Sequence, residues 1–499
     1  MEFILAVDIG TGSCRSALYS RDFERQGMAA VAYPSRYSQP DWAEQDPEAI
    51  YTAVLQAIAR TLTESGVHSK DILAFTLDGA LHTFIGLTDD GVPVTPILTW
   101  ADSRARHLVQ QWKQDDVGAD VYERTGCPLH PMYTFAKLAW FRKHAPEIFR
   151  RIHTVVSVKS YILYRLTGLL MEDRAIASGS GLLNVTTLDW DETTLKIAGI
   201  SRAHLPPLVD PDFRISGILV DAAQRTGLPQ AVLVIVGSSD AAMSSLGSGT
   251  IGPDQMTVMV GTSGAVRRPV ATPTLDPQQR TFCYYAWEKV WLAGGALNNG
   301  GIVLRWFRDH FGDRARKVAR DRGISSYSVL CDEAHAIPAG ADGLVFLPFL
   351  AGERSPYWNA NVRGTLLGLS LQHGQAHMVR ALMEGICYGI WSVAQPLEAL
   401  TGTSREIRVS GGFTRSTVWM QILANVMGRE LVVASEPEAS VLGATVLAGH
   451  ALGLIDSFQC LQDKNPVVQI IHPEEKLHEF YAEQFKRYLR LYWKLQDEF

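Results

Sequence analysis

Residues 3–20, FILAVDIGTGSCRSALYS, decide the fold of this chain. The first six are apolar and partly β-branched, which predicts a strand that ends at Asp8. GTGS at 10–13 supplies the small residues of a tight turn, and CRSALYS predicts a returning strand. MTVMVGTSGAVRRPV at 256–270 repeats this pattern about half a chain later. We therefore expect a fold with an internally duplicated hairpin.

Helical and strand-like stretches alternate along the rest of the chain. Apolar residues recur at helical spacing in some segments, and short apolar runs predict strands between them. This alternation predicts an α/β fold with mixed sheets. The predicted helices cover 47–66, 135–150, 159–167, 298–311, 376–401, 416–427 and 473–497, and the predicted strands cover 72–77, 231–237, 343–350 and 430–435.

The segment LGSGTIGPD predicts a domain boundary near 248–255, because it concentrates glycine and proline in the middle of the chain. We expect an N-terminal domain over 1–248 and a C-terminal domain over 249–499. The length of 499 residues allows each domain a substantial core.

Composition narrows the classes of function. With 46% hydrophobic and 20% charged residues, the chain is not intrinsically disordered. A net charge of -6 leaves no bulk cationic field for nucleic acid or anionic lipid. The six cysteines form no CxxC pair, which is typical of a reducing compartment. The N-terminus lacks the pattern of a signal peptide, and no apolar run is long enough to span a bilayer. We expect a cytoplasmic enzyme without nucleic-acid or membrane partners.

The first hairpin is a candidate anion site. In DIGTGSCR, at 8–15, a carboxylate precedes a turn of small residues whose backbone N–H groups can point at an anion. Thr11 and Ser13 add hydroxyl groups, and Arg15 adds a cation. The alternative is a plain hairpin turn with an exposed acid. Because VGTSGAV at 260–266 has the same character, the two turns can hold a polyphosphate from both sides of a cleft.

Asp240 is the candidate for acid–base chemistry. It follows the apolar run AVLVIVG at 231–237, and open α/β sheets bind ligands at the carboxyl ends of their strands. The alternative is that Asp240 caps the helix predicted for AAMSSL, and the two roles are compatible. The strand, two glycines and helix of 409–428 allow a flat ring such as a nucleobase to lie against backbone, or form a simple strand-to-helix turn.

Other motifs are absent or lack their context. There is no Walker-type loop and no HRD or DFG triplet of protein kinases. The GxGxxG formed by Gly247, Gly249 and Gly252 does not follow a predicted strand, which disfavours dinucleotide binding. HGQAH at 373–377 has metal-pair spacing but no evident third ligand.

The order of the motifs resembles that of the FGGY carbohydrate kinases, the family of glycerol kinase, xylulokinase and the larger type of gluconokinase. The resemblance covers nearly the whole chain and implies two actin/hexokinase-like (ribonuclease H-like) domains with ATP and a sugar in the cleft between them. It rests on DIGTGSCR (8–15), WADSRA (100–105), YRLTG (164–168), GSSDAA (237–242), VGTSG (260–264), GERSPYWN (352–359), VSGG (409–412) and EASVLGATVLAG (438–449).

The resemblance also implies roles for single residues. Asp240 matches the general base for the attacking sugar hydroxyl, and Asp8 matches the acid that helps to hold Mg²⁺, so both are expected at the metal. The expected ATP-binding residues are Thr11, Gly12, Ser13 and Arg15 at the phosphates, Gly261 and Thr262 opposite them, and Gly301, Gly411, Gly412 and Ser416 around the adenosine.

The expected substrate is a sugar acid. TLDGALHT, at 76–83, lacks the Arg-Glu pair of glycerol kinases, and its Leu81-His82 resembles the Met-His pair of xylulokinases and gluconokinases. GCPLHPMYTFAKLAW, at 126–140, resembles the gluconokinase substrate loop through His130 and Met132. Asp78 departs from the small residue expected there.

We therefore predict ATP-dependent phosphorylation of D-gluconate to 6-phosphogluconate. The candidate donors to the carboxylate are His82, His130 and Lys137, each of which can equally be structural. The alternatives are a ketopentose kinase similar to xylulokinase and a non-catalytic sugar-binding regulator, which the presence of both Asp8 and Asp240 disfavours. A homodimer is compatible with the sequence.

Overall fold

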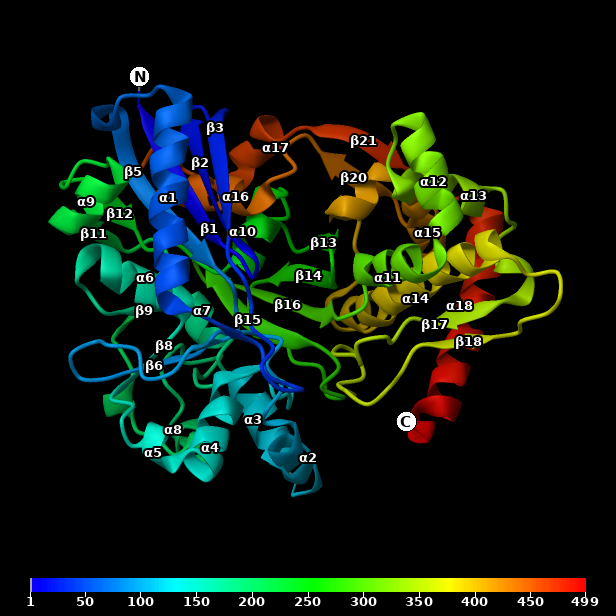
Figure 1. The fold of residues 1–499 in the computed structure, drawn as a ribbon, viewed down its shortest axis with the longest axis horizontal. Coiled ribbons are helices and arrows are strands. Elements are labelled where there is room, and N and C mark those ends of the chain that lie inside the picture. Colours follow the sequence, from blue (N-terminus) through cyan, green and yellow to red (C-terminus); the bar gives the residue numbers. More distant parts are fainter. Residues whose placement is uncertain (1, 116) are drawn as a thin grey trace.

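Two large sheets, one in each half of the chain, form the framework (Figure 1). The computed structural model describes residues 2–115 and 117–499, so Met1, the first residue of the expected N-terminal domain, lies outside them. In spatial order the first sheet contains β11 (Arg214–Ser216), β12 (Leu233–Ile235), β5 (Ile72–Gly79), β1 (Phe3–Ile9), β2 (Ser13–Ser20) and β3 (Arg25–Ala32). The second contains β15 (Phe282–Trp287), β16 (Val290–Leu297), β14 (Gly264–Val270), β13 (Gln255–Val260), β19 (Glu406–Ser410), β20 (Leu431–Ala434) and β21 (Val467–Ile471).

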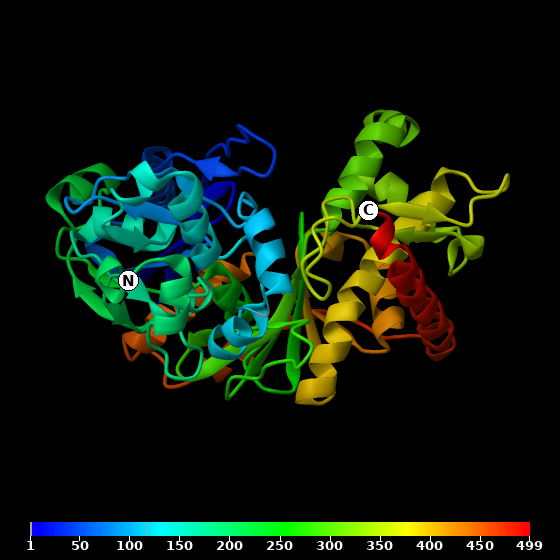
Figure 2. The same cartoon turned by 90° about the horizontal axis from the view of Figure 1, so that it is seen from below.

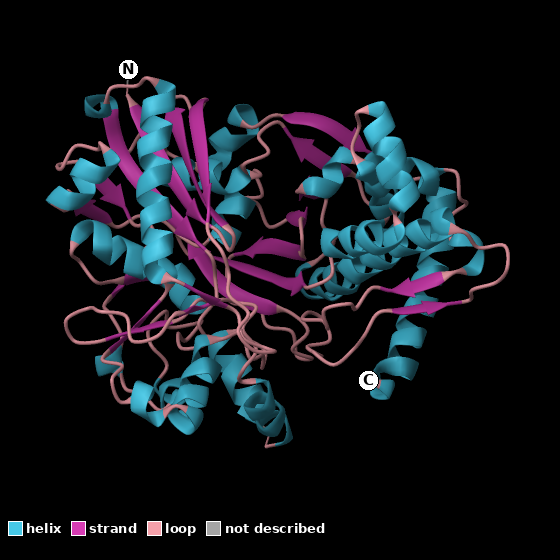
Figure 3. Cartoon of the chain, viewed as in Figure 1, coloured by secondary structure: helices cyan, strands magenta, loops and turns pink. Residues whose placement is uncertain are grey.

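The two sheets share the arrangement of six strands, and β15 adds a seventh at one edge of the second sheet. β1 pairs antiparallel with β2 and parallel with β5, and β13 pairs in the same way with β14 and β19. An antiparallel strand then follows each hairpin, β3 in one sheet and β16 in the other. At the far edge, antiparallel β11 and β21 occupy matching places. The duplication expected from the two hairpins is thus present in the strand pairing, and Figure 3 shows both sheets with helices around them.

Both faces of the first sheet are buried, and β1 shows how. Phe3, Leu5 and Val7 pack with the apolar side of α1 (Pro47–Ser65), whereas Ile4 and Ala6 pack with α16 (Ala439–Ala451). Because side chains alternate along a strand, Asp8 continues the row on the α16 side. The sheet therefore places this carboxylate toward the second half of the chain.

The helices lie around these sheets, and Figure 2 shows the two ends of the chain in separate lobes with the green strands between them. The remaining helices of the first half are α2 (Arg106–Gln114), α3 (Val117–Thr125), α4 (Thr134–His144), α5 (Pro146–Phe149), α6 (Val158–Thr167), α7 (Arg174–Ser178), α8 (Glu192–Ala198), α9 (Val220–Thr226) and α10 (Asp240–Gly247). Those of the second half are α11 (Gly301–Phe311), α12 (Asp313–Arg322), α13 (Ser326–His335), α14 (Gln375–Thr401), α15 (Thr417–Met427), α17 (Leu461–Lys464) and α18 (Glu475–Leu495).

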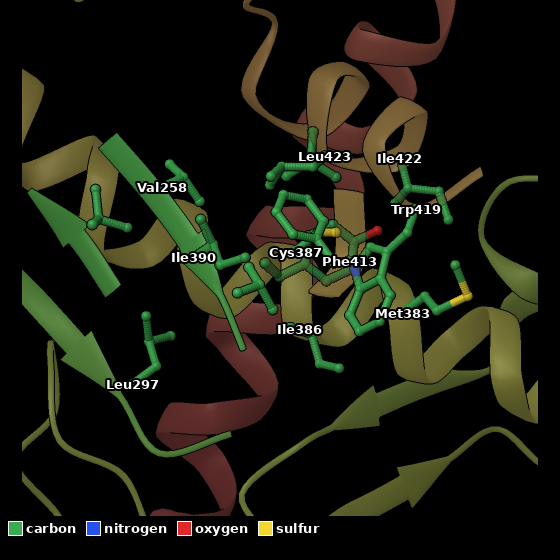
Figure 4. Packing of buried hydrophobic residues seen from close by; sticks show 14 of the residues in the cluster. Val258, Leu297, Met383, Ile386, Cys387, Ile390, Phe413, Trp419, Ile422 and Leu423 are labelled. Atoms are coloured by element: carbon green, nitrogen blue, oxygen red, sulfur yellow. The ribbon is translucent and has the colours of Figure 1, made fainter. Parts of the chain in front are cut away.

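Short strand pairs complete the structure. They are β4 (Glu44–Gln45) with β7 (Ile97–Leu98), β6 (Ile85–Leu87) with β8 (Thr154–Val156), β9 (Glu172–Asp173) with β10 (Leu208–Val209), and β17 (Val345–Leu347) with β18 (Thr365–Leu367). The core of the second half lies between the second sheet and α14 and α15, where Ile386, Ile390 and Trp419 meet Val258 and Leu297 (Figure 4).

Helices α10 and α16 join the two halves. α16 belongs to the second half of the chain, yet it packs on β1, β5 and α10 beside the first sheet (Figure 1). The contact is close because glycines face backbone: a Cβ on Gly247 would lie 1.8 Å from the Ala439 carbonyl oxygen, and one on Gly443 would lie 2.0 Å from that of Met243. In segment 248–255, which joins α10 to β13, residues 248–250 and 255 are buried, whereas Pro253 and Asp254 are exposed. We retain the division at 248 as a proposal.

Several elements differ in extent from the sequence prediction. The helix predicted over 135–150 is divided at Ala145, because a residue before proline avoids the helical conformation. The helix predicted from 298 begins at Gly301, since Asn298 and Asn299 instead donate to the carbonyl oxygens of Ala351 and Gly352. The strands predicted over 231–237 and 343–350 are shortened to 233–235 and 345–347. Among the described residues, no helix combines the length and apolar character needed to cross a membrane.

Candidate active site

Asp8 lies at the end of β1 with one oxygen engaged and one free. Its Oδ2 accepts hydrogen bonds from Arg15 Nη1 at 3.0 Å and from Ser440 Oγ, at the start of α16, at 3.1 Å. Its Oδ1 is buried and has no hydrogen-bond partner among the residues that the structure describes. A buried carboxylate oxygen without a partner is costly, which suits a position that receives a ligand.

Asp78 lies beside Asp8 in the parallel register of β1 and β5. Burial, followed by the charge of Asp8, raises the pKa of Asp78 well above its usual range. Asp78 is therefore held as the neutral acid, and it adds a polar group to the site without a second charge.

The turn of the first hairpin is fixed from outside. Trp100 Nε1 donates to Thr11 Oγ1 at 3.0 Å, and Gln45 Nε2 donates to the Thr11 carbonyl oxygen at 2.5 Å. Tyr33 OH donates to the Gly10 carbonyl oxygen at 2.5 Å. Gly12 is exposed at the tip, where an added Cβ would meet no described atom within 4 Å. Hydrogen bonds thus hold the turn at Gly10 and Thr11, while its tip at Gly12 is exposed, and this arrangement suits the binding of an anion.

Asp240 is the first residue of α10, and the helix is capped by its neighbour. Ser239 accepts from the Ala242 amide at 3.1 Å and is the N-cap, so the alternative that Asp240 caps this helix is wrong. Asp240 Oδ1 accepts from the Ala241 amide at 2.7 Å. Burial and then the charge of Asp8 raise the pKa of Asp240 to about 6, while Arg267 and the amides of Ala241 and Leu81 lower it. This pKa is well placed for a general base near neutral pH.

A buried lysine holds the turn that leads to Asp240. Lys159 Nζ donates to the carbonyl oxygens of Gly237 at 2.6 Å and Ser238 at 3.3 Å, and it pairs with Asp173 at 2.7 Å. All of its polar contacts are protein groups, so Lys159 positions the turn.

The second hairpin is tied to the start of α11. The Gly301 amide donates to the Gly261 carbonyl oxygen at 2.8 Å, and the Ile302 amide donates to that of Thr262 at 3.0 Å. A Cβ on Gly300 would lie 2.6 Å from the Ser263 backbone, so the approach needs glycine there. The hairpin and the helix therefore form one rigid wall.

A cavity of about 550 Å³ adjoins this wall. Gly261, Thr262, Gly301, Gly412 and Ser416, all expected at ATP, lie on its surface. Gly411 is not among the lining residues; its φ of +98° and its close approach to Val260 position the following turn. No sequence motif pointed to the part of the lining formed by α13, which includes Tyr327, Ser328 and Asp332. The volume and the mixed polar and aromatic lining suit a nucleoside.

Histidines and tyrosines meet near Asp240 in the region where the sequence predicts the substrate. This region, around His82, His130, Tyr133 and Tyr284, is called the sugar side below. His82 Nδ1 donates to the Gly179 carbonyl oxygen at 2.6 Å, and its ring packs edge-on against Tyr133 at 5.1 Å and Tyr284 at 5.6 Å between centroids. The two tyrosine hydroxyls are 2.7 Å apart. Burial lowers the pKa of His82 to about 3, so its imidazole is neutral and Nε2 is an acceptor.

His130 is neutral too, but in the other tautomer. Its Nδ1 accepts from the Met132 amide at 3.2 Å, which leaves Nε2–H as a donor, and its ring packs against Trp358. Burial lowers its pKa well below the usual range. Met132 itself is wholly buried and packs in the same apolar cluster as Leu81.

Lys137, a candidate donor to a substrate carboxylate, is engaged elsewhere. Its Nζ donates to the carbonyl oxygens of His82 at 2.6 Å and Thr99 at 2.8 Å. It is wholly buried, and this burial lowers its pKa to about 7. The structure therefore makes Lys137 a support for the backbone of His82.

Asp8 and Asp240 fit a magnesium ion bound mainly through a nucleotide. No cluster of three or more metal-ligating side chains occurs in the described part of the chain. Mg²⁺ commonly uses one or two carboxylates together with phosphate oxygens and water. The unpartnered Oδ1 of Asp8 provides one such oxygen.

Comparisons with known proteins cover both halves of the chain. The model for the FGGY family of carbohydrate kinases, N-terminal domain, matches residues 3–247, and the model for the C-terminal domain matches residues 256–452. Gluconokinase from Bacillus subtilis (strain 168) is 37% identical over 463 residues, which span 92% of this chain and 90% of that protein.

Solved structures agree with the fold. A gluconate kinase from Lactobacillus acidophilus superposes with a TM-score of 0.93 at 32% identity, over 99% of this chain and 98% of that one. A ligand-bound xylulose kinase from the same organism gives the same TM-score, 0.93, at 32% identity over 99% of each chain.

Proposed function

Since the chain belongs to the FGGY family of carbohydrate kinases, we propose that it transfers the γ-phosphoryl group of ATP to D-gluconate and forms 6-phosphogluconate. The choice of a sugar acid is supported by the similarity to gluconokinases. The observation that carries the chemistry is the carboxylate of Asp240 at the start of α10, which is held by backbone amides and lies close enough to Asp8 for that charge to raise its pKa.

Asp240 acts as the general base in this proposal. Its Oδ1 stays on the Ala241 amide, and its second oxygen accepts the proton of the attacking sugar hydroxyl. The hydroxyl oxygen then forms a bond to the γ-phosphorus as the bond to the ADP oxygen breaks. Phosphoryl transfer needs positioning and charge stabilisation more than covalent catalysis, so no nucleophilic side chain is required.

The phosphates lie between the two hairpins. Thr11, Gly12, Ser13 and Arg15 approach them from the first half, and Gly261 and Thr262 approach from the second. The nucleoside occupies the cavity beside Gly301, Gly412 and Ser416, with Gly411 supporting the turn. Mg²⁺, held by Asp8 and Asp240, supplies neutralisation of the phosphate charge.

The neutral histidines form hydrogen bonds with hydroxyl groups of the substrate. His82 offers an acceptor at Nε2, and His130 offers a donor at the same atom of its ring. Together they can orient two hydroxyls of an open-chain sugar. Leu81 and Met132 shape the apolar wall from which these rings project.

A substrate panel tests the proposal. ADP release is coupled to a spectrophotometric readout with gluconate, xylulose, ribulose and glycerol as acceptors, and Asp240→Asn serves as the inactive control. We expect the highest kcat/KM with gluconate. The similarity to a xylulose kinase makes xylulose the second candidate, and a higher kcat/KM for xylulose would replace gluconate in the proposal.

A further inference from the structure

On the basis of the proposed function, we propose that Arg267 and Arg354 bind the carboxylate of the sugar acid and so set the preference for acids over neutral sugars. Neither residue was singled out by its sequence motif. Both come from the second half of the chain, and both lie against residues of the sugar side.

Arg267 is a buried guanidinium group with unused donors. It lies on β14, and its Nε and Nη1 are buried without a hydrogen-bond partner within the described residues. The neighbouring Arg268 differs in this respect: it donates to the carbonyl oxygens of Pro253 and Gly402 and to Ser404 Oγ. Two consecutive arginines on one strand thus have opposite roles, one structural and one left with free donors.

The strand register directs Arg267 toward the sugar side. Val266 and Val270 of β14 pack into the core of the second half, so Arg267 faces the other way. Arg267 is opposite Gly294, which in turn is opposite Phe282, two residues before Tyr284. Tyr284 contacts the His82 ring, so the face of the sheet that carries Arg267 is the face that packs against His82. The glycine opposite Arg267 has no side chain that could compete for the space.

Arg354, in the loop after β17, approaches the sugar side as well. Its guanidinium carbon lies 4.6 Å from the centroid of the Trp100 ring, and its Nη2 donates to the Leu297 carbonyl oxygen at 3.2 Å. Its Nε is buried and has no partner in the part of the chain that the structure describes. These contacts fix the orientation of the Arg354 guanidinium group, and its Nε–H remains available as a donor.

The side chain of the neighbouring acid, Glu353, forms no ion pair with the Arg354 guanidinium group among the described residues. Glu353 accepts from the Asn298 amide at 2.5 Å, from Asn299 Nδ2 at 3.0 Å and from the Arg354 amide at 2.9 Å. Of the ion pairs found among the described residues, none includes Arg267 or Arg354. Burial lowers the pKa of both guanidinium groups. The charge of Asp240 raises the pKa of Arg267 and that of Glu353 raises the pKa of Arg354, which the charge of Arg267 lowers to a smaller extent.

Two buried cations that repel each other are costly unless an anion joins them. The two histidines are neutral and so offer this anion no charge, and Lys137 directs two of its three donors at backbone carbonyl groups. A planar guanidinium group matches a carboxylate through two parallel N–H donors. The charge of Arg267 lowers the pKa of Asp240, so its guanidinium group belongs to the same site as the proposed base.

The test compares gluconate with D-glucitol, which has the same carbon chain and a neutral CH₂OH in place of the carboxylate. Calorimetry measures the Kd of each ligand for the wild type and for Arg267→Gln, Arg267→Lys, Arg354→Gln and Arg354→Lys. We expect each Gln variant to weaken gluconate binding about 10- to 150-fold and to change glucitol binding less than about threefold, because one charge-assisted hydrogen bond is lost. Lys keeps the charge without the fork, so its loss on gluconate should be smaller.

A stability measurement separates ligand binding from a structural role. Removing an unpaired buried charge should leave the thermal midpoint of the free protein unchanged or raised, while the stabilisation by gluconate disappears. Arg363→Gln is the matched control, because Arg363 donates only to nearby backbone carbonyls of the same loop region. Should a Gln variant not fold, the corresponding Lys variant carries the comparison.

Each outcome decides between explanations. Equal losses on gluconate and glucitol, or a lower thermal midpoint in the free variants, would overturn the role of the arginines at the carboxylate. A raised KM for ATP with unchanged gluconate binding would assign them to the phosphoryl group and also overturn it. The proposed function is judged separately in the wild type: failure to phosphorylate gluconate would overturn that function, whatever the variants show.

Discussion

The carboxylate of Asp240 is not needed as a helix cap, because the residue before it has that role. Ser239 caps α10 through the Ala242 amide, so Asp240 does not have to satisfy the helix N-terminus. Lys159 holds the preceding turn by its carbonyl groups. The residues that position this acid are therefore distinct from the acid itself.

Asp240→Asn should reduce kcat by about 10²- to 10⁴-fold, because the amide cannot accept the hydroxyl proton. The fold should be retained, since the Ser239 cap remains. Steady-state kinetics and the thermal midpoint check both statements. Ser239→Ala is the matched control: it should cost about 0.5–2 kcal/mol of stability and leave most of the turnover. A variant of Asp240 with more than about a tenth of the wild-type kcat would exclude it as the base.

The pH profile should report the raised pKa of Asp240. A general base works in its deprotonated form, so activity should fall as pH decreases through that pKa. Because burial and Asp8 raise the pKa from 3.8 to about 6, the acidic limb of kcat/KM should lie near pH 6. The profile is measured with saturating ATP and varied sugar. A limb close to pH 4 would mean that the titrating base is not held in this environment.

At the scale of elements, the crossing of α10 and α16 connects the chemistry to the fold. α10 begins with Asp240, and α16 is preceded closely by Glu438 and carries Ser440, which donates to Asp8. The two helices touch through Gly247 and Gly443. This contact between helices from opposite halves thus brings Ser440 to Asp8, beside the helix that begins with Asp240.

Gly247→Ala and Gly443→Ala should destabilise the protein. In each case the added Cβ would meet a backbone carbonyl group, which cannot move aside as a flexible side chain can. Overpacking of this kind typically costs about 1–3 kcal/mol. Gly374→Ala is the control, since its Cβ would meet no described atom within 4 Å. Thermal denaturation of the three variants provides the measurement, and equal midpoints for all of them would show that the crossing tolerates a wider separation.

At the scale of the whole molecule, two sheets of the same topology carry the two hairpins. Segment 248–255 connects the sheets, and its Gly249 has a φ of +82° beside Arg408, which donates to the Ser248 carbonyl oxygen at 2.8 Å. A side chain at this position would be strained as well as crowded. The connection is therefore short and well defined.

Binding of ATP and sugar together should close the two lobes about segment 248–255. Closure excludes water that would otherwise compete for the γ-phosphoryl group. Small-angle scattering should show a smaller radius of gyration with both ligands than with either alone, and Asp240→Asn allows the ternary complex to persist. An unchanged radius with both sites occupied would argue for a preformed closed site.

The hairpins, the acids and the α/β class were predictable because they depend on short-range patterns. Segments 3–20 and 256–270 each have the pattern of a strand, a turn of small residues and a returning strand. Asp8 and Asp240 each follow an apolar run. The alternation of helices and strands then predicted an α/β fold with mixed sheets. Local signals of this type need only neighbours along the chain.

Tertiary structure alone decided what these pieces do together. The packing of α16 on the first sheet, the two hydrogen bonds from Lys137 to carbonyl groups and the unused donors of Arg267 and Arg354 have no counterpart in a local pattern. The sequence shows the charge of each side chain, but burial and partners determine whether that charge is neutralised, saturated or left available. Those depend on contacts between residues far apart in the chain, which is why the sequence specified the acids of the site and only the fold separated structural cations from those free to bind an anion.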